Sequence, residues 1–199
     1  VDIPNVVGTP GSHEMVIYAG NFSQGAMYKA FDILLQAWGE VHRQEPRMRL
    51  RLFGGGETTR WKKVAEQEGC GDSVEFVGQT GDLLQEFLKA GFLVLPSRVE
   101  GLSNVLLEAQ AAGLPAVVSD IGGNRAIVEN RKNGLVVPVG DTMALANAML
   151  ELFRSPEQRS QMGHEARIRI QETFAMPKVA AQLESAYLHA QSIFCAHSA

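Results

Sequence analysis

Apolar and polar positions follow two different patterns along this chain. Short apolar runs predict strands, and where a run is apolar throughout, the strand is covered on both faces. The runs lie at 15–20, 48–56 (where the pattern alternates and then breaks at three glycines), 73–78, 92–97, 115–120 and 134–138. Longer stretches with apolar residues three and four positions apart predict helices at 28–42, 58–69, 81–91, 103–113, 124–130, 142–153, 156–173 and 178–194.

This alternation of strands and helices decides the fold class. It predicts an α/β, Rossmann-like, doubly wound parallel sheet of about six strands, with helices on both faces and a helical C-terminal tail. Ligands of such sheets bind beyond the carboxyl ends of the strands. The segments directly after each strand are therefore the places to search for a site.

Composition and charge narrow the function classes. The length of 199 residues is enough for one domain, and a composition of 45% hydrophobic and 20% charged residues is typical of a globular protein. A net charge of −4 argues against nucleic acid as the partner. Cys70 and Cys195 have no metal-ligand spacing, so we expect unpaired thiols in a reducing compartment and no metal site. The sequence contains no stretch of about 18 apolar residues, so no membrane span is predicted.

The first fourteen residues differ in character from the rest. Residues 1–14 contain Pro and Gly, and have neither the basic nor the apolar region of a signal peptide. We expect them to be a linker, followed by one domain over 15–199. The chain reads as though another segment preceded it.

The segment 96–104 combines a strand exit with a helix start. Free N–H groups and the helix dipole make such a start an anion site, and Gly101 would let a ligand approach the backbone. Ser103 is a candidate N-cap, as is Asp82 at the start of the predicted helix 81–91. Glu100 stands at the mouth of this helix and Glu108 inside it, among apolar residues. Each of these features also has a plain structural interpretation, as a turn or a solvated carboxylate.

A longer stretch gives these residues a context. The segment "PSRVEGLSNVLLEAQAAGLPAVVSDIGGNRAIVENRKNGLVVPVGD", residues 96–141, resembles the signature of the group 1, or family 4, retaining glycosyltransferases. The shared frame has a Glu, seven intervening residues and a second Glu. The resemblance covers nearly the whole chain, but it extends only to the C-terminal, donor-binding half of the family's enzymes. Those enzymes have the GT-B fold, in which two Rossmann-type domains face each other across a cleft.

The resemblance implies a role for each residue of this segment. Glu100 would contact hydroxyls of the donor sugar and Glu108 the ribose hydroxyls, since a carboxylate can accept two hydrogen bonds from a diol. The backbone of Gly101, Leu102, Ser103 and Asn104 would cradle the diphosphate. The resemblance implies neither a metal nor a cofactor, and the chain has no Asp-x-Asp pattern.

The exit of the first strand departs from the family pattern. The family places Gly-Arg-Leu there and Lys-Gly a few residues later, whereas this chain has Gly20, Asn21 and, after a longer loop, Lys29. Lys29 would grip the diphosphate and act with Glu100 in catalysis, while Asn21 stands in place of the usual Arg. Val77 and Gly78 are candidates for backbone contacts to the nucleobase.

The resemblance implies that this domain binds a nucleoside-diphosphate sugar for retaining glycosyl transfer. The acceptor would be a glycan, lipid or small-molecule hydroxyl, held by a missing N-terminal domain, without which we expect no transfer. The alternatives are a nucleotide-sugar epimerase of the same fold and a non-catalytic nucleotide-sugar-binding module. A NAD enzyme lacks its fingerprint, because "FGGGE" has no third spaced Gly. The expected location is cytoplasmic, with the inner face of a membrane as the alternative.

Overall fold

The computed structural model describes residues 14–180 and 184. Six strands form one sheet: β1 (Met15–Ala19), β2 (Arg49–Phe53), β3 (Val74–Gly78), β4 (Phe92–Leu95), β5 (Ala116–Ser119) and β6 (Gly134–Val137). All strand pairs are parallel, and the order across the sheet is β3-β2-β1-β4-β5-β6. This is the doubly wound order, so the predicted fold class is confirmed.

Helices connect the strands and continue beyond the last one. The α-helices are α1 (Phe31–Gln44), α2 (Thr59–Gln67), α3 (Leu83–Lys89), α4 (Asn104–Ala111), α5 (Gly122–Ile127), α6 (Thr142–Arg154) and α7 (Pro156–Thr173), and two short 3-10 helices are η1 (Gln24–Lys29) and η2 (Gly71–Ser73). None of the described helices is both long and apolar enough to cross a membrane.

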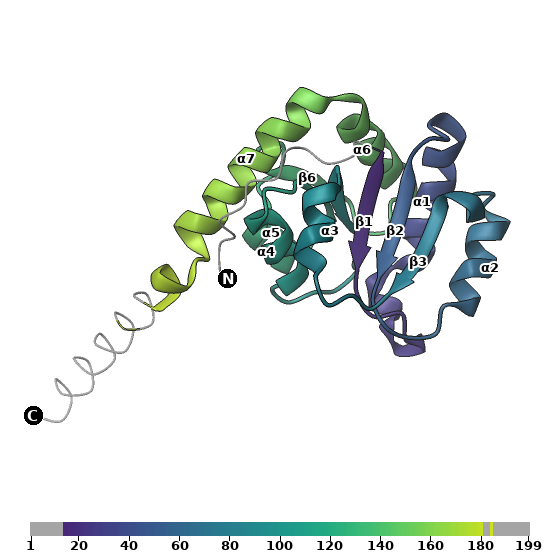
Figure 1. Ribbon diagram of the computed structural model, residues 1–199, viewed down its shortest axis with the longest axis horizontal. Helices are drawn as coiled ribbons and strands as arrows, with labels where there is room; N and C mark the ends of the chain where they lie inside the picture. The colour runs from purple at the N-terminus through teal and green to yellow at the C-terminus, as the bar shows by residue number, and fades with distance from the viewer. Residues whose placement is uncertain (1–13, 181–183, 185–199) are drawn as a thin grey trace, which may run out of the picture.

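The helices cover both faces of the sheet, as Figure 1 shows. From β1 the chain moves through β2 to the β3 edge, then returns to β4 and continues to the β6 edge. Right-handed crossovers therefore place α1 and α2 on one face and α3, α4 and α5 on the other. Helix α6 packs against α1, and α7 packs against α4.

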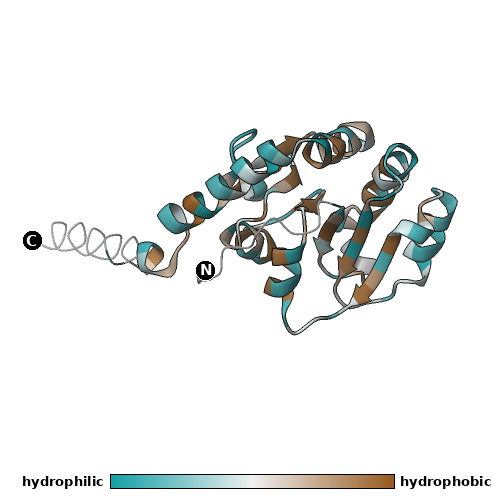
Figure 2. Cartoon of the chain, turned by 45° about the horizontal axis from the view of Figure 1, so that its top comes forward, coloured by the Kyte–Doolittle hydropathy of each residue, from teal (hydrophilic) through white to brown (hydrophobic). Residues whose placement is uncertain are grey.

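The core lies where the helices meet the central strands. Every residue of β4 and β5 is buried, as are most residues of β1. In Figure 2 the strands carry much of the hydrophobic colour, with hydrophilic bands on some of them, and the outer helix faces are largely hydrophilic. Helix α1 buries Leu34, Leu35, Trp38 and Val41 on one side, which is the three-and-four spacing of the sequence. The Trp38 Nε1 donates a hydrogen bond of 2.9 Å to the buried Ser73 Oγ.

The structure confirms two predicted helix caps. Asp82 accepts a hydrogen bond from the Gln85 N–H, and Ser103 accepts one from the Leu106 N–H. Each side chain thereby satisfies one of the N–H groups that a helix start leaves free.

Some helix bounds differ from the prediction. The predicted helix at 28–42 is wrong at its start, because η1 ends at Lys29 and α1 begins only at Phe31. Between them Ala30 has a left-handed backbone (φ 56°), which apolar spacing does not predict. Helix α5 lies at 122–127 instead of 124–130, since Val128 is already extended. Most of the predicted helix 178–194 falls outside the described residues.

The strand order puts a switch point between β1 and β4 at the carboxyl edge of the sheet, the place where sheets of this type have their ligand crevice. Strands β1 and β4 are neighbours, yet the chain leaves them in opposite directions, toward β2 and β5. The loops that follow them, at 20–30 and 96–103, flank this switch point, where sheets of this type bind their ligands. These two loops carry most of the candidate residues.

Candidate functional site

The exit of β1 is built on close backbone contact with the exit of β2. The Gly20 N–H donates to the Phe53 carbonyl at 2.9 Å, and the Phe22 N–H donates to the Gly55 carbonyl at 2.8 Å. A Cβ on Gly54 would lie 1.8 Å from the Gly20 carbonyl oxygen, so only glycine fits. The three glycines after β2 thus turn the chain beside the crevice.

Asn21 is exposed on this loop and folds back onto it. Its Oδ1 accepts a hydrogen bond of 2.8 Å from the Ser23 N–H. An asparagine that bonds the backbone two residues on stabilises a turn. The side chain that replaces the family's usual arginine therefore shapes the loop in this structure.

Lys29 and Glu100 meet across the crevice. The Lys29 Nζ lies 2.5 Å from Glu100 Oε1, and the two side chains are only 14% and 12% exposed. Lys29 ends η1, which follows β1, and Glu100 lies in the loop after β4. The Lys29 side chain is therefore not directed into solvent. The fold brings together two charges that are 71 residues apart in the sequence.

Arg98 was not among the predicted site residues, although it lies two positions before Glu100. Its guanidinium binds Asp32 of α1 with two hydrogen bonds, of 3.0 and 2.7 Å, and also donates to the Met27 carbonyl at 2.8 Å. Its backbone N–H donates to the Tyr28 carbonyl at 2.7 Å. The sequence signal was an arginine at a strand exit, which by itself does not reveal an acidic partner 66 residues away.

Tyr18 is a second residue that sequence reasoning missed. Its side chain is fully buried near the end of β1, and its hydroxyl has no hydrogen-bond partner among the described residues. Burial raises the pKa of this hydroxyl well above its usual value, and the negative charge of Glu100 raises it further. Tyr18 therefore stays neutral beside the Glu100 carboxylate. Its apolar run on β1 predicts only a core position, so no sequence signal marks it.

The start of α4, at Asn104, follows Glu100 by four residues. Gly101, Leu102 and Asn104 are exposed, while Ser103 is buried as the N-cap. The first N–H groups of a helix have no partner within it, and the positive end of the helix dipole adds to their attraction for an anion. Backbone N–H groups, together with the Lys29 ammonium, can thus bind an anionic group at this end of the crevice.

Glu108 lies on the exposed side of α4. It is one helical turn after Asn104, and both are exposed. Its carboxylate has no hydrogen-bond or ion-pair partner within the part of the chain that the structure describes. The apolar neighbours of Glu108 in the sequence face the core, so its position costs no buried charge.

Helix α5 packs its first turn against the Glu100–Gly101 backbone. A Cβ on Gly123 would lie 1.9 Å from the Gly101 carbonyl oxygen and 2.6 Å from that of Glu100. The buried Asn124 side chain donates to the Ser119 carbonyl at 3.0 Å, and the Ser119 hydroxyl donates to the Ser97 carbonyl. These buried bonds tie the exits of β4 and β5 together beneath the site.

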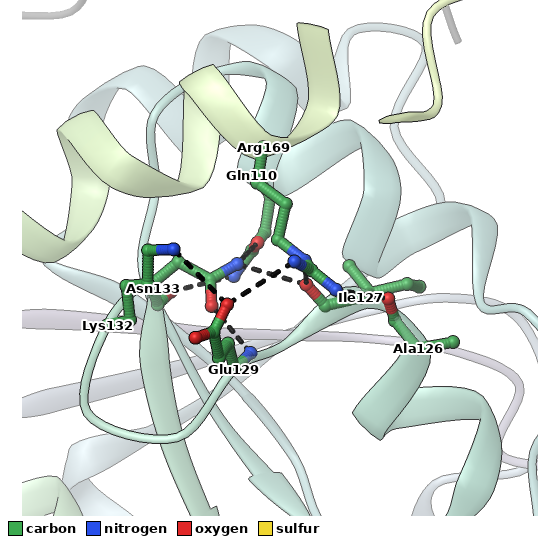
Figure 3. Close-up of polar contacts among 7 residues, drawn as sticks. All are labelled: Gln110, Ala126, Ile127, Glu129, Lys132, Asn133 and Arg169. Carbon is green, nitrogen blue, oxygen red and sulfur yellow. Dashed lines mark hydrogen bonds and ion pairs between the residues drawn. The ribbon is translucent and has the colours of Figure 1, made fainter. Parts of the chain in front are cut away.

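The other end of α5 is held by a polar cluster, drawn in Figure 3. Arg169 of α7 donates to the carbonyls of Ala126 and Ile127 at 2.9 and 2.7 Å. Asn133 also donates to the Ile127 carbonyl, at 3.0 Å, and exchanges hydrogen bonds with the buried Gln110 of α4. A cation at a helix C-terminus is favourable. The cluster therefore fixes a short helix whose N-terminus abuts Gly101.

Val77 and Gly78 lie at the same edge of the sheet but farther along it. They end β3, one of the two edge strands, and the Gly78 carbonyl accepts a hydrogen bond of 2.8 Å from the Gly54 N–H. Three strand spacings separate β3 from β4, or about 14 Å. The structure thus places these two residues in line with the crevice, without contact to Lys29 or Glu100.

The site offers chemistry for a ligand that carries both an anion and hydroxyl groups. Lys29 and the helix start attract negative charge, whereas Glu100 and Glu108 can accept hydrogen bonds from hydroxyls. The described residues contain no group of three or more His, Cys, Asp or Glu side chains that could hold a metal ion.

Comparison with protein families gives one match. The sequence model described as "Glycosyl transferases group 1" matches residues 13–155. Among curated proteins, a D-inositol 3-phosphate glycosyltransferase of Saccharomonospora viridis is 30% identical over 200 residues, which cover 94% of this chain and 46% of that protein. The chain spans less than half the length of the first curated relatives that it matches.

Solved structures show the same fold. Sucrose-phosphate synthase from Thermosynechococcus elongatus superposes with a TM-score of 0.79 at 30% identity, over 94% of this chain and 47% of that one. TarM of S. aureus, crystallised in complex with UDP among other ligands, gives a TM-score of 0.86 at 20% identity, over 93% of this chain and 37% of that one.

Proposed function

This chain belongs to the family of group 1 glycosyltransferases, and from that premise we propose that it binds a nucleoside-diphosphate sugar for transfer of the sugar to a hydroxyl acceptor. The binding site is the crevice between the loops that follow β1 and β4. The TarM structure, which contains UDP, supports a nucleoside diphosphate as the common part of the ligand.

The observation that carries this proposal is the ion pair between Lys29 and Glu100. A lysine and a glutamate that are both largely buried at a strand exit, with a helix start beside them, are arranged for a ligand that is anionic at one end and hydroxylated at the other. Lys29 would bind the diphosphate, together with the N–H groups of Gly101, Leu102, Ser103 and Asn104. Glu100 would accept hydrogen bonds from the sugar hydroxyls next to it.

The rest of the nucleotide would lie along the carboxyl edge of the sheet. Glu108, exposed and without a partner among the described residues, would bind the ribose hydroxyls. The backbone of Val77 and Gly78 would lie beside the base, and Gly20 and Asn21 would line the crevice between them. About 14 Å from β3 to β4 is a length suited to an extended nucleoside diphosphate.

The reaction would cleave the bond between the sugar C1 and the diphosphate oxygen and join C1 to the acceptor oxygen, with retention of configuration, while the acceptor hydroxyl proton passes to the oxygen of the leaving diphosphate. Lys29 and the α4 N-terminus would stabilise the negative charge of the leaving diphosphate without a metal ion. Relatives of which this chain covers less than half support the view that a further, N-terminal domain binds the acceptor glycan, lipid or small molecule. We therefore expect this chain alone to bind the donor and not to transfer it.

Calorimetric titration of a Lys29→Met variant tests the proposal. UDP, GDP and ADP are each titrated against the parent chain, and the diphosphate that binds most tightly is compared with its nucleoside. Loss of a direct lysine–phosphate contact should weaken diphosphate binding about tenfold or more, or about 1.4 kcal/mol, and leave nucleoside binding nearly unchanged. EDTA should change neither affinity.

Lys89→Met provides the matched control, because Lys89 is an exposed lysine of α3 that also pairs with a glutamate. It should bind both ligands like the parent chain. If no diphosphate binds the parent chain at millimolar concentration, or if Lys29→Met binds it as tightly as the parent does, the proposed site is wrong.

A further inference from the structure

The segment that carries Lys29 has little to hold it in place by itself. Helix η1 has no side-chain cap at its start, and the residue after its end is Ala30, whose left-handed backbone is unfavourable for a residue with a Cβ. The Ala30 N–H donates to the Met27 carbonyl at 3.2 Å, and the Ala30 carbonyl accepts from the Leu34 N–H at 3.0 Å. A strained residue persists where its surroundings hold it, so the contacts around it need an explanation.

Arg98 supplies those contacts from the opposite loop. One of its guanidinium nitrogens donates both to the Met27 carbonyl and to Asp32, and the other donates to Asp32 alone. Met27 precedes Lys29 by two residues, and Asp32 follows it by three. A single side chain thus binds both ends of the turn that contains Lys29 and Ala30.

The backbone of the same residue completes the link. The Arg98 N–H donates to the Tyr28 carbonyl at 2.7 Å. This bond joins the residue before Lys29 to the residue two positions before Glu100. The relative placement of the two charged side chains therefore follows from how Arg98 joins the two loops.

The chemistry of this link requires an arginine. Its planar guanidinium has donors directed to two sides, and here it contacts a carboxylate in two-point fashion and a backbone carbonyl as well. A lysine could keep the charge but not this set of bonds. The ion pair alone is a third exposed at each side chain, 35% and 33%, and exposed pairs contribute little to stability. The contribution of the Arg98–Asp32 pair is therefore to position the turn rather than to stabilise the fold.

We propose that Arg98, together with Asp32, is a positioning residue of the donor site: it fixes the 27–30 turn against the loop after β4 and thereby holds the Lys29 ammonium where the diphosphate binds. This inference rests on the proposed function. The Arg98 guanidinium bonds Asp32 and the Met27 carbonyl, so we place its effect on the diphosphate in the position of Lys29.

A double-mutant cycle between Arg98 and Lys29 tests the proposal. Arg98→Lys, Lys29→Met and the double variant are titrated with UDP and uridine, or with the diphosphate and nucleoside that bind most tightly to the parent chain. Arg98→Lys should weaken diphosphate binding about tenfold and leave nucleoside binding unchanged. In the Lys29→Met background it should have no further effect, because no ammonium remains to be positioned. Asp32→Asn should reproduce Arg98→Lys.

Arg131→Lys is the matched control. Arg131 also binds a carboxylate, that of Glu151, with two hydrogen bonds. It lies before the edge strand β6, whereas Arg98 follows the central strand β4. The Arg131→Lys variant should bind the diphosphate and the nucleoside with the affinities of the parent chain. A loss shared equally by diphosphate and nucleoside, or a full additional loss in the Lys29→Met background, would show that Arg98 serves stability alone and would overturn the proposal.

Hydrogen exchange separates this proposal from the proposed function. In Arg98→Lys the amides of residue 98 and Ala30 should exchange at least about tenfold faster than in the parent chain, while the amides of β1 keep their rates. That comparison needs no ligand. If no nucleoside diphosphate binds the parent chain, the proposed function fails, and the positioning role with it, even where exchange is faster. If exchange at these two amides is unchanged, Arg98 does not hold the turn, whatever the ligand.

Discussion

Two adjacent glycines at the start of α5 should respond in opposite ways when each is replaced by alanine: one variant should be more stable than the parent chain and the other less stable. A Cβ on Gly122 meets nothing within 4 Å, whereas a Cβ on Gly123 would lie 1.9 Å from the Gly101 carbonyl oxygen. Both positions are in the first turn of the same helix, and neither has a positive φ. Any gain from a less flexible unfolded chain should therefore be similar for the two variants.

The expected magnitudes follow from this difference. Gly122→Ala should stabilise the fold by about 0.4–1 kcal/mol through the unfolded state. Gly123→Ala makes that gain as well, but it must push α5 away from the Glu100–Gly101 backbone, and overpacking of this kind costs about 1–3 kcal/mol. For a chain of this length, 1 kcal/mol corresponds to roughly 2–4 °C in melting temperature.

Thermal and urea unfolding of the two variants and the parent chain measure the effect. Gly122→Ala should melt slightly above the parent chain and Gly123→Ala clearly below it. Diphosphate affinity should fall in Gly123→Ala alone, because Glu100 and Gly101 are the residues displaced. Equal stability of the two variants would refute the reasoning, since it would mean that α5 does not rest on the Gly101 carbonyl.

Three further predictions concern single positions. Gly101→Ala has open space for its Cβ, so, like Gly122→Ala, it should not lower the melting temperature, but its methyl group should obstruct ligand approach to the backbone and weaken diphosphate binding in calorimetry. Unchanged binding would mean that the diphosphate does not contact this backbone. Ser73→Ala removes the acceptor of the buried Trp38 N–H and should cost about 1–3 kcal/mol in urea unfolding, whereas a change near zero would mean that water replaces the hydroxyl. Burial raises the pKa of the Cys70 thiol to about 11. Its folded pKa is thus above the unfolded value of about 8.5, so the stability it contributes is complete below that pH and declines as pH rises toward 11. In a Cys195→Ser chain, Cys70 should resist Ellman's reagent at pH 8 until the protein unfolds, and rapid labelling of the folded chain would contradict its burial.

Sequence pattern accounts well for the elements whose signal is local. Short apolar or alternating runs identified all six strands. The runs of β4 and β5 are continuous because both faces of these strands are covered, whereas β2 alternates between Arg and apolar residues. The side chains of Asp82 and Ser103 identified two helix starts, because capping depends on residues three apart in the chain. Local pattern failed at residues 28–30, where the left-handed Ala30 interrupts what apolar spacing predicts as one helix.

The candidate site divides in the same way. Glu100, Glu108 and Lys29 stood out because a resemblance to a family with a long, specific segment gave them a context, and that family is confirmed. The roles assigned to these residues remain predictions. Arg98 and Tyr18 were missed, since a lone arginine in a loop and a tyrosine in an apolar strand look the same with or without a partner nearby.

The sequence by itself determined the strands, the alternation that makes the sheet parallel, and the family. Only the tertiary structure decided that Lys29 meets Glu100, that Arg98 joins both ends of the turn between η1 and α1, and that Gly123 rests on the Gly101 carbonyl. Hydrophobic periodicity depends on residues a few positions apart, so it can be recognised from the sequence alone. Contacts between residues 20–70 positions apart depend on the strand order, which the packing of the whole sheet sets.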